Sequence, residues 1–144
     1  MTTQEQFPFA LVRLTRRWRK LLDEQLKDLG VTQARWSTLV YLHRGGQGVT
    51  QRELANLMAI ENPTLVRLLD GLESQKLIER RACELDRRAR RLFLTEEGER
   101  FMQELNRRAS ALRQQLLNGV SEQELEFCLR VFRRVQESAD ALGD

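Results

Sequence analysis

Histidine and cysteine are scarce in this sequence of 144 residues, which contains one histidine and two cysteines. Cys83 and Cys128 lie far apart and form no CxxC pair. One chain therefore cannot assemble a four-ligand zinc site from cysteine and histidine, and we expect no metal and no cofactor. We interpret both thiols as reduced, small apolar side chains. A redox switch at Cys83 is the alternative, although nothing nearby in the sequence clearly activates this thiol.

Motifs of catalysis are also missing. The chain has one tyrosine and contains no GxSxG, no HExxH and no nucleotide-binding loop. The glycine-rich stretch 45–48 lacks the GK[ST] of a phosphate loop and is interpreted as a turn. The neighbouring acids Glu96 and Glu97 lie at the start of a predicted helix, where the helix dipole favours negative charge. We therefore expect a protein that is not an enzyme.

Long hydrophobic segments are absent as well. The first apolar residues, between Phe7 and Leu11, are soon followed by Arg13, which argues against a signal peptide. No apolar run is long enough to cross a bilayer. We expect a cytoplasmic protein that does not associate with membranes.

The charge that is present is unevenly distributed. The chain has 24 basic and 21 acidic residues, a formal net charge of only +3. Arginines are concentrated between Arg80 and Arg91, and a second basic group lies between Arg13 and Lys20. The planar guanidinium suits phosphates and guanine edges better than the lysine ammonium does. The basic group 13–20 is explained equally well by a solvated helix face. For the segment 80–91, the sequence motif in which it lies favours binding of nucleic acid.

Hydrophobic spacing and capping signals predict a mainly α-helical protein with a small β-hairpin, an α+β fold. Thr50 and Glu53 form a capping box, as do Ser121 and Glu124. Asn62 is predicted to be an N-cap, with a proline at the first helical position. The predicted helices cover about 9–29, 32–44, 50–58, 62–76, 95–118 and 121–142, and the predicted strands cover 77–81 and 91–95.

Two short helices joined by a tight turn at 59–61 and followed by a hairpin make a winged helix-turn-helix. A recognition helix enters the major groove with its N-terminal end, where small or hydrogen-bonding side chains are needed. Asn62, Pro63, Thr64 and Arg67 occupy that end. Arginine can pair with O6 and N7 of guanine, and the threonine methyl can touch that of thymine. The sequence therefore predicts double-stranded DNA as the partner.

The predicted wing is the arginine-rich turn 83–90, whose DNA-binding candidates are Asp86, Arg87 and Arg88. A narrow minor groove has an enhanced negative potential and accommodates an arginine side chain. We expect Asp86 to hold the guanidinium of Arg88 through paired hydrogen bonds. Two alternatives to specific recognition are binding of nucleic acid without sequence preference and binding of another protein by the winged helix.

The first helix and the last two have wide apolar stripes that one small chain cannot cover completely. We expect these helices to form a dimer, with an intramolecular bundle as the alternative. The corresponding segments are an N-terminal dimerisation helix over 1–31, a DNA-binding lobe over 32–100 and C-terminal dimerisation helices over 101–144. Together they are expected to form a single intertwined domain.

A family resemblance rests on the wing and on the recognition segment. Residues 86–98, DRRARRLFLTEEG, resemble the wing signature of the MarR family of bacterial regulators. Residues 60–73, IENPTLVRLLDGLE, are similar to the corresponding segment of the SlyA branch, as are 17–22 and 29–33. The resemblance implies a homodimer that binds pseudo-palindromic promoter sites and represses genes, or activates them by displacing silencing proteins. It also implies that Pro63, Thr64 and Arg67 meet the major groove, and Arg88 with Asp86 the minor groove.

The same resemblance implies an effector, because many relatives respond to aromatic carboxylates held between the dimerisation helices and the DNA-binding lobe. In this chain the place is lined by Arg17, Trp18, Trp36, Leu39 and His43. The alternative is that the residues of the second helix are packing core. Relatives that sense peroxide have a reactive cysteine near the N-terminus, and this chain has none there.

Overall fold

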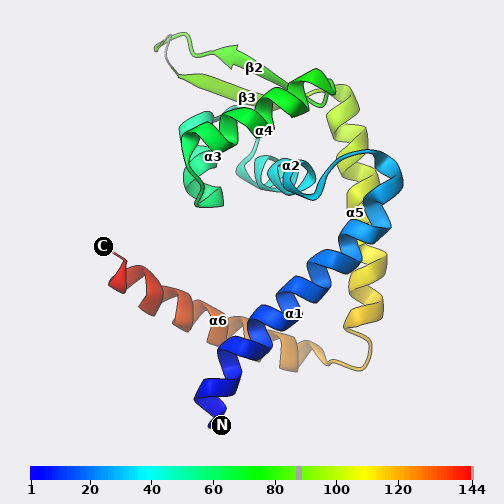
Figure 1. Ribbon diagram of the computed structural model, residues 1–144, viewed down its shortest axis with the longest axis vertical. Coiled ribbons are helices and arrows are strands. Elements are labelled where there is room, and N and C mark those ends of the chain that lie inside the picture. The colour runs from blue at the N-terminus through cyan, green and yellow to red at the C-terminus, as the bar shows by residue number, and fades with distance from the viewer. Residues whose placement is uncertain (87–88, 144) are drawn as a thin grey trace. The chain divides into compact units, whose positions relative to one another are not determined.

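The computed structural model describes residues 1–86 and 89–143 and confirms a mainly helical protein with a small antiparallel sheet. Two compact units make up the chain, Met1–Ser110 and Ala111–Asp144. The elements, labelled in Figure 1, are α1 (Thr3–Leu26), the 3-10 helix η1 (Lys27–Leu29), α2 (Gln33–Gly45), β1 (Val49–Thr50), α3 (Gln51–Met58), α4 (Asn62–Ser74), β2 (Ile78–Ala82), β3 (Arg90–Leu94), α5 (Glu96–Leu116) and α6 (Glu122–Leu142).

The sheet has three strands in the order β1-β3-β2, with both neighbouring pairs antiparallel. The predicted hairpin of β2 and β3 is confirmed, with Ile78 opposite Leu94. Strand β1 was not predicted, because two residues are too few to show an alternating pattern and Thr50 also caps α3. Val49 lies opposite Leu92, so β1 attaches the start of the helix-turn-helix to the wing.

Capping decides where several helices begin. Helix α1 begins at Thr3 and not near residue 9, because Thr2 and Glu5 form a capping box that the prediction missed. The predicted box of Thr50 and Glu53 is confirmed, with Glu53 N donating to Thr50 Oγ1 over 3.1 Å. The predicted box at Ser121 is likewise present.

The prediction that Asn62 is an N-cap is wrong by one residue. Helix α4 begins at Asn62, and Glu61 is the N-cap, with no hydrogen bond from its side chain to the helix. The Asn62 side chain has another partner, because its Oδ1 accepts a hydrogen bond of 3.3 Å from Gln51 Nε2. Asn62 therefore connects α4 to the first residue of α3.

The hydrophobic core lies within the unit Met1–Ser110 and is built largely from leucines. Helices α2, α3 and α4 and strand β3 each contribute at least one of them, and burial of a leucine side chain stabilises the fold by about 1.5–3 kcal/mol. The fully buried leucines of these elements are Leu39, Leu42, Leu54, Leu65, Leu69, Leu72 and Leu92. Because Leu65, Leu69 and Leu72 of α4 face the core, its polar residues are left on the opposite face.

An arginine on α5 fastens this helix to the end of α1 and to η1 within the same unit. Arg108 Nη1 donates to the carbonyl of Gln25 over 2.6 Å and to the carboxylate of Asp28, and its Nε donates to Glu104 over 2.8 Å. The hydrogen bonds of Glu104 with Arg107 and Arg108 lower its pKa to about 2.

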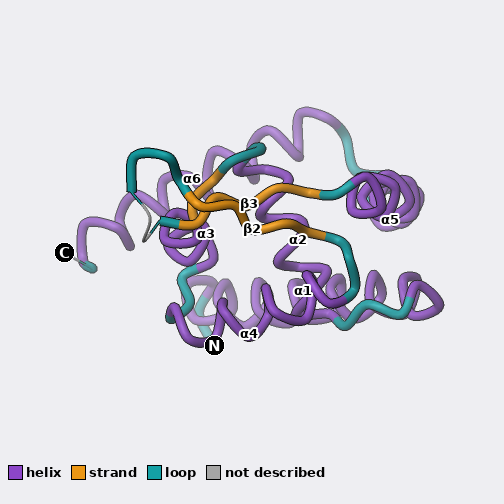
Figure 2. The backbone as a smooth tube through the Cα atoms, turned by 90° about the horizontal axis from the view of Figure 1, so that it is seen from above, coloured by secondary structure: helices purple, strands orange, loops and turns teal. Residues whose placement is uncertain are grey.

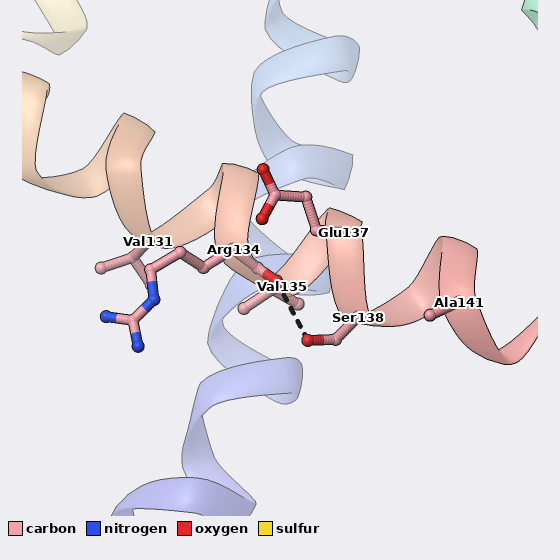
Figure 3. Close-up of a pocket in the computed structure, with 6 residues that line it drawn as sticks. All are labelled: Val131, Arg134, Val135, Glu137, Ser138 and Ala141. Atoms are coloured by element: carbon pink, nitrogen blue, oxygen red, sulfur yellow. Dashed lines mark hydrogen bonds between the residues drawn. The ribbon is translucent and has the colours of Figure 1, made fainter.

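Helix α6 makes up most of the unit Ala111–Asp144, and apolar side chains are exposed along it. Phe127, Leu129, Phe132 and Val135 have exposed fractions of 60%, 53%, 42% and 48%. A shallow hollow lies along the C-terminal half of α6, where Ser138 Oγ donates to the carbonyl of Arg134 over 3.1 Å (Figure 3). Among the described residues, no helix is long and apolar enough to span a membrane.

Candidate nucleic-acid interface

The N-terminal end of α4 presents its polar residues to solvent. Asn62, Pro63, Thr64 and Arg67 are all exposed, whereas Leu65 is fully buried. The leucines that hold α4 in the core recur at helical spacing, which leaves these four predicted residues together on the outer face. The arrangement gives a helix end with three donor side chains, the methyl group of Thr64 and a proline exposed to solvent.

The wing is formed by β2, β3 and the turn between them, which lies at the end of the hairpin away from α5 in both views (Figures 1 and 2). Backbone bonds close its base, with Cys83 N donating to the carbonyl of Ala89 over 3.0 Å. Asp86 is exposed, and its carbonyl accepts from Ala89 N over 3.1 Å. Arg87 and Arg88 lie outside the described residues, so the predicted bond between Asp86 and Arg88 stays a prediction.

Leu85 was not singled out in the sequence and is 96% exposed in the wing turn. Nothing in the local pattern distinguishes it from a core leucine. Its place becomes evident only once the hairpin is built.

Arginine residues between 80 and 91 have different roles. Arg80 does not point to the wing tip: its Nη2 donates to Asp70 over 2.6 Å and its Nε to Glu73 over 2.8 Å. Both acids lie on α4, and the bond to Glu73 contributes most to the raised pKa of Arg80. Arg80 thus fastens β2 to the recognition helix. Arg91 is also engaged in the lobe, because its Nη1 donates to the carbonyl of Gly48 over 2.9 Å.

Arg81 lies on the other face of β2, where its guanidinium stacks 4.1 Å from the centre of the Phe93 ring. It also forms an ion pair of 2.8 Å with Glu79. A cation over an aromatic face is stabilised by the ring quadrupole. This contact stiffens the hairpin below its turn.

A groove separates the wing from the helix-turn-helix, with a volume of about 320 Å³. Its lining brings the start of α3, the start of α4 and the base of the wing together. The lining residues are Thr50, Gln51, Arg52, Asn62, Asp86, Ala89 and Arg90. Arg52 and Arg90 are exposed cations here that were not among the DNA-binding residues predicted from the sequence. The exposure of Arg52 could have been predicted from its position inside the capping box at the start of α3.

The sequence showed nothing that activates the thiol of Cys83, but in the structure its neighbours at the base of the wing lower its pKa. The backbone N–H of Leu85 lowers the pKa of the Cys83 thiol most, followed by the Arg91 side chain and the N–H of Asp86. The thiol is half-buried, and Cys128 is exposed on α6. The three donors were invisible in the sequence because the turn and the opposite strand supply them.

The residues predicted to line an effector site lie in different environments. Trp36 and Leu39 belong to the hydrophobic core, with exposed fractions of 5% and 0%. Trp36 Nε1 donates to Asp23 Oδ1 of α1 over 3.0 Å. Trp18 is half-buried, and Arg17 and His43 are exposed. No group of three or more histidine, cysteine or acidic residues that could hold a metal occurs in 1–86 or 89–143.

The buried leucines, the exposed end of α4 and the adjoining wing define a winged helix-turn-helix DNA-binding protein. The model of the MarR family matches residues 29–89. The crystal structure of the transcriptional regulator PA3341 is similar, with 40% identity, a TM-score of 0.86 and coverage of 94% of this chain and 98% of that chain. The chain belongs to the MarR family of transcriptional regulators, whose winged helices bind DNA.

Two further structures support this assignment. The crystal structure of MarR has 27% identity and a TM-score of 0.75, over 94% of this chain and 98% of that chain. A mutant of MepR from S. aureus, bound to an oligodeoxyribonucleotide, has 26% identity and a TM-score of 0.64, over 92% of this chain and 97% of that chain.

Proposed function

We propose that this regulator is a homodimer that recognises pseudo-palindromic promoter sites by sequence. The observation that carries the proposal is the exposed end of α4 facing the wing across one groove. Two recognition helices related by two-fold symmetry enter successive major grooves about 34–36 Å apart. Because its site of action is promoter DNA, we place the protein in the cytoplasm.

The proposed major-groove contacts come from Asn62, Pro63, Thr64 and Arg67. Arg67 suits the O6 and N7 atoms of guanine, and the Thr64 methyl suits the thymine methyl. The Glu61 side chain makes no cap hydrogen bond, so it does not occupy the N–H groups of Asn62 and Thr64 in the first turn of α4. Such groups can donate to a DNA phosphate and fix the register of the helix.

The proposed minor-groove contacts come from the wing residues Asp86, Arg87 and Arg88. This assignment depends on the family resemblance of the wing sequence and on the exposure of Asp86 at its turn. MepR, the relative crystallised with an oligodeoxyribonucleotide, supports DNA as the ligand of this fold. The sequence of segment 60–73 favours the SlyA-like branch within the family.

Dimerisation is proposed to use the segment 1–31 and the segment 101–144, with the lobe 32–100 left to bind DNA. Apolar side chains on both segments are exposed in a single chain: Phe9 by 69% and Leu14 by 58% on α1, and Phe127 by 60% on α6. Contiguous exposed apolar surface marks an interaction site. A second copy of the chain is the partner that covers it in this proposal.

A small aromatic carboxylate is proposed as an effector, bound by Arg17, Trp18, Trp36, Leu39 and His43. Exposed Arg17 supplies a positive charge for the carboxylate, and the half-buried indole of Trp18 supplies an aromatic surface next to it in sequence. Since Trp36 and Leu39 are buried, the ligand has to enter by separating α1 from α2. Titration of tryptophan fluorescence with a substituted benzoate tests this, and a Trp18→Leu variant identifies the responding ring.

Selection from a randomised duplex library at near-physiological salt tests the main proposal. We expect a palindrome with half-sites about one helical turn apart. The Arg67→Ala variant should lose about 1–3 kcal/mol at one base pair of each half-site. Arg100→Ala is the matched control, because this exposed arginine lies on α5 and its one ion pair among the described residues is a 3.8 Å contact with Glu96. Enrichment of no sequence, with binding that disappears as salt rises, would favour the non-specific or protein-binding alternatives.

A further inference from the structure

The C-terminal end of α4 is held by one glutamine that bonds to two other parts of the lobe. Gln75 Oε1 accepts a hydrogen bond of 3.0 Å from Arg35 Nη1 on α2. Gln75 Nε2 donates to the carbonyl of Gly30 over 3.1 Å. Gly30 lies between η1 and α2, where the N-terminal helical segment ends. The end of the recognition helix is thus bonded both to α2 and to the junction that leads to α1.

Arg35 is also pressed onto the backbone of α4 at Gly71. A Cβ atom built on Gly71 would lie 2.5 Å from both Cζ and Nε of Arg35. No side chain larger than hydrogen fits between α4 and the guanidinium in this position. Alanine is a better helix former than glycine, so the glycine in the interior of α4 is explained by the approach of Arg35 and not by the helix itself.

The guanidinium of Arg35 bonds to a neutral side chain. Among residues 1–86 and 89–143, Arg35 forms no ion pair, and its side-chain hydrogen bond goes to the neutral amide of Gln75. The side chain is half-buried. This position requires the planar shape and directed donors of a guanidinium, because the group lies flat on Gly71 while one of its N–H groups donates to Gln75.

We infer that Arg35 and Gln75 are positioning residues, which fix the angle at which the recognition helix meets DNA. The inference depends on the proposed function of α4. Helix α4 has 13 residues and is therefore about 20 Å long, so a pivot of about 5° at Gln75 moves its N-terminal end by about 2 Å. Hydrogen bonds to base edges tolerate much less than this displacement. Neither residue contacts DNA in this scheme, because both act at the opposite end of the helix.

The geometry provides a sharp genetic test. In Gly71→Ala the new methyl group meets the far end of a flexible side chain, so Arg35 moves away while the fold is retained. Gly71→Ala and Arg35→Ala should therefore remove the same contact. We expect each single variant, and Gln75→Ala, to lose about 10-fold in affinity for the selected operator, because the displaced helix end weakens at least one base contact. The double variant Arg35→Ala/Gly71→Ala should bind the operator with about the affinity of the weaker-binding single variant, because both substitutions remove the same contact.

Operator affinity is measured beside affinity for a random duplex at the same salt concentration, and folding is checked by thermal unfolding. The expected pattern is loss of operator affinity with unchanged binding of random duplex, because a displaced helix loses base contacts before phosphate contacts. Arg44→Ala, an exposed arginine on the same helix as Arg35, is the matched control and should bind like wild type.

Wild-type operator affinity in Arg35→Ala and Gln75→Ala would overturn the inference. So would equal losses on operator and random DNA, or losses that add fully in the double variant. A wild-type protein that does not prefer any sequence would instead contradict the proposed function, so the two failures are distinguishable.

Discussion

Replacement of Gly98 by alanine should destabilise the protein, although helix propensity alone favours the opposite result. Gly98 is buried in the first turn of α5, and its N–H donates to Thr95 Oγ1 over 3.0 Å. A Cβ atom there would overlap the carbonyl oxygen of Leu77 and lie 3.1 Å from its carbonyl carbon and 3.3 Å from Leu94 Cδ2. The new methyl group has no free space.

The carbonyl of Leu77 cannot easily turn away, because it accepts a 3.1 Å hydrogen bond from Thr95 N. The N–H of Leu77 is also held, by a 3.0 Å bond to the carbonyl of Leu72. Alanine gains about 1 kcal/mol over glycine in a helix. Overpacking costs about 1–3 kcal/mol, and a strained or lost backbone hydrogen bond costs about 1 kcal/mol more. We therefore expect a net loss of about 1–3 kcal/mol in the free energy of unfolding.

Urea unfolding followed by circular dichroism measures this difference. Protein concentration has to be held constant, because association contributes to apparent stability. Gly45→Ala is the matched control: Gly45 ends α2, and its added Cβ would have its nearest contact at 3.4 Å, an ordinary van der Waals distance. A Gly98→Ala variant as stable as wild type, or more stable, would refute the close packing of α5 on the Leu77 carbonyl.

Three further results are expected. Arg80→Ala should lose about 1 kcal/mol in the free energy of unfolding measured in urea, and less at high salt, because an ion-pair network is removed. The pKa of Glu104 is lowered from 4.5 to about 2, so its contribution to stability is complete above pH 4.5 and is lost as pH falls toward 2. In the Arg108→Gln variant, the free energy of unfolding should depend less steeply on pH between 4.5 and 2 than it does in the wild-type protein. In a variant without the other cysteine, alkylation of Cys83 should have its midpoint at a lower pH than in urea-unfolded chain, and Arg91→Gln should raise it.

Much of the fold was predictable from local signals. Capping boxes at Thr50 and Ser121 locate two helix starts because the reciprocal hydrogen bonds need only four consecutive residues. Alternating apolar residues locate β2 and β3 to within one residue. The exposed face of α4 followed from the spacing of its leucines. Each of these signals depends on neighbours in sequence, which is why it could be interpreted without the structure.

Features that depend on partners far away in sequence were not predictable. Strand β1 exists because β3 offers it a free edge. The cap prediction at Asn62 was one residue late because the side chain of Asn62 bonds to Gln51 and not to its own helix. From the sequence alone, Gly71 is expected to destabilise the helix. The structure explains it by Arg35, which lies 36 positions earlier in the sequence and packs against it.

The arginine-rich segment shows how the same residue type can serve two roles in one short stretch. Side chains alternate across a strand, so Arg80 shares a face with Ile78 and points toward α4, where acids at 70 and 73 are one helical turn apart. Arg81, on the other face, stacks on Phe93. Arg80 holds the wing against α4, whereas Arg81 stiffens the hairpin itself. The charge available to phosphates is therefore smaller than the count of arginines indicates, and the salt dependence of DNA binding should reflect only the cations at the groove and the wing turn.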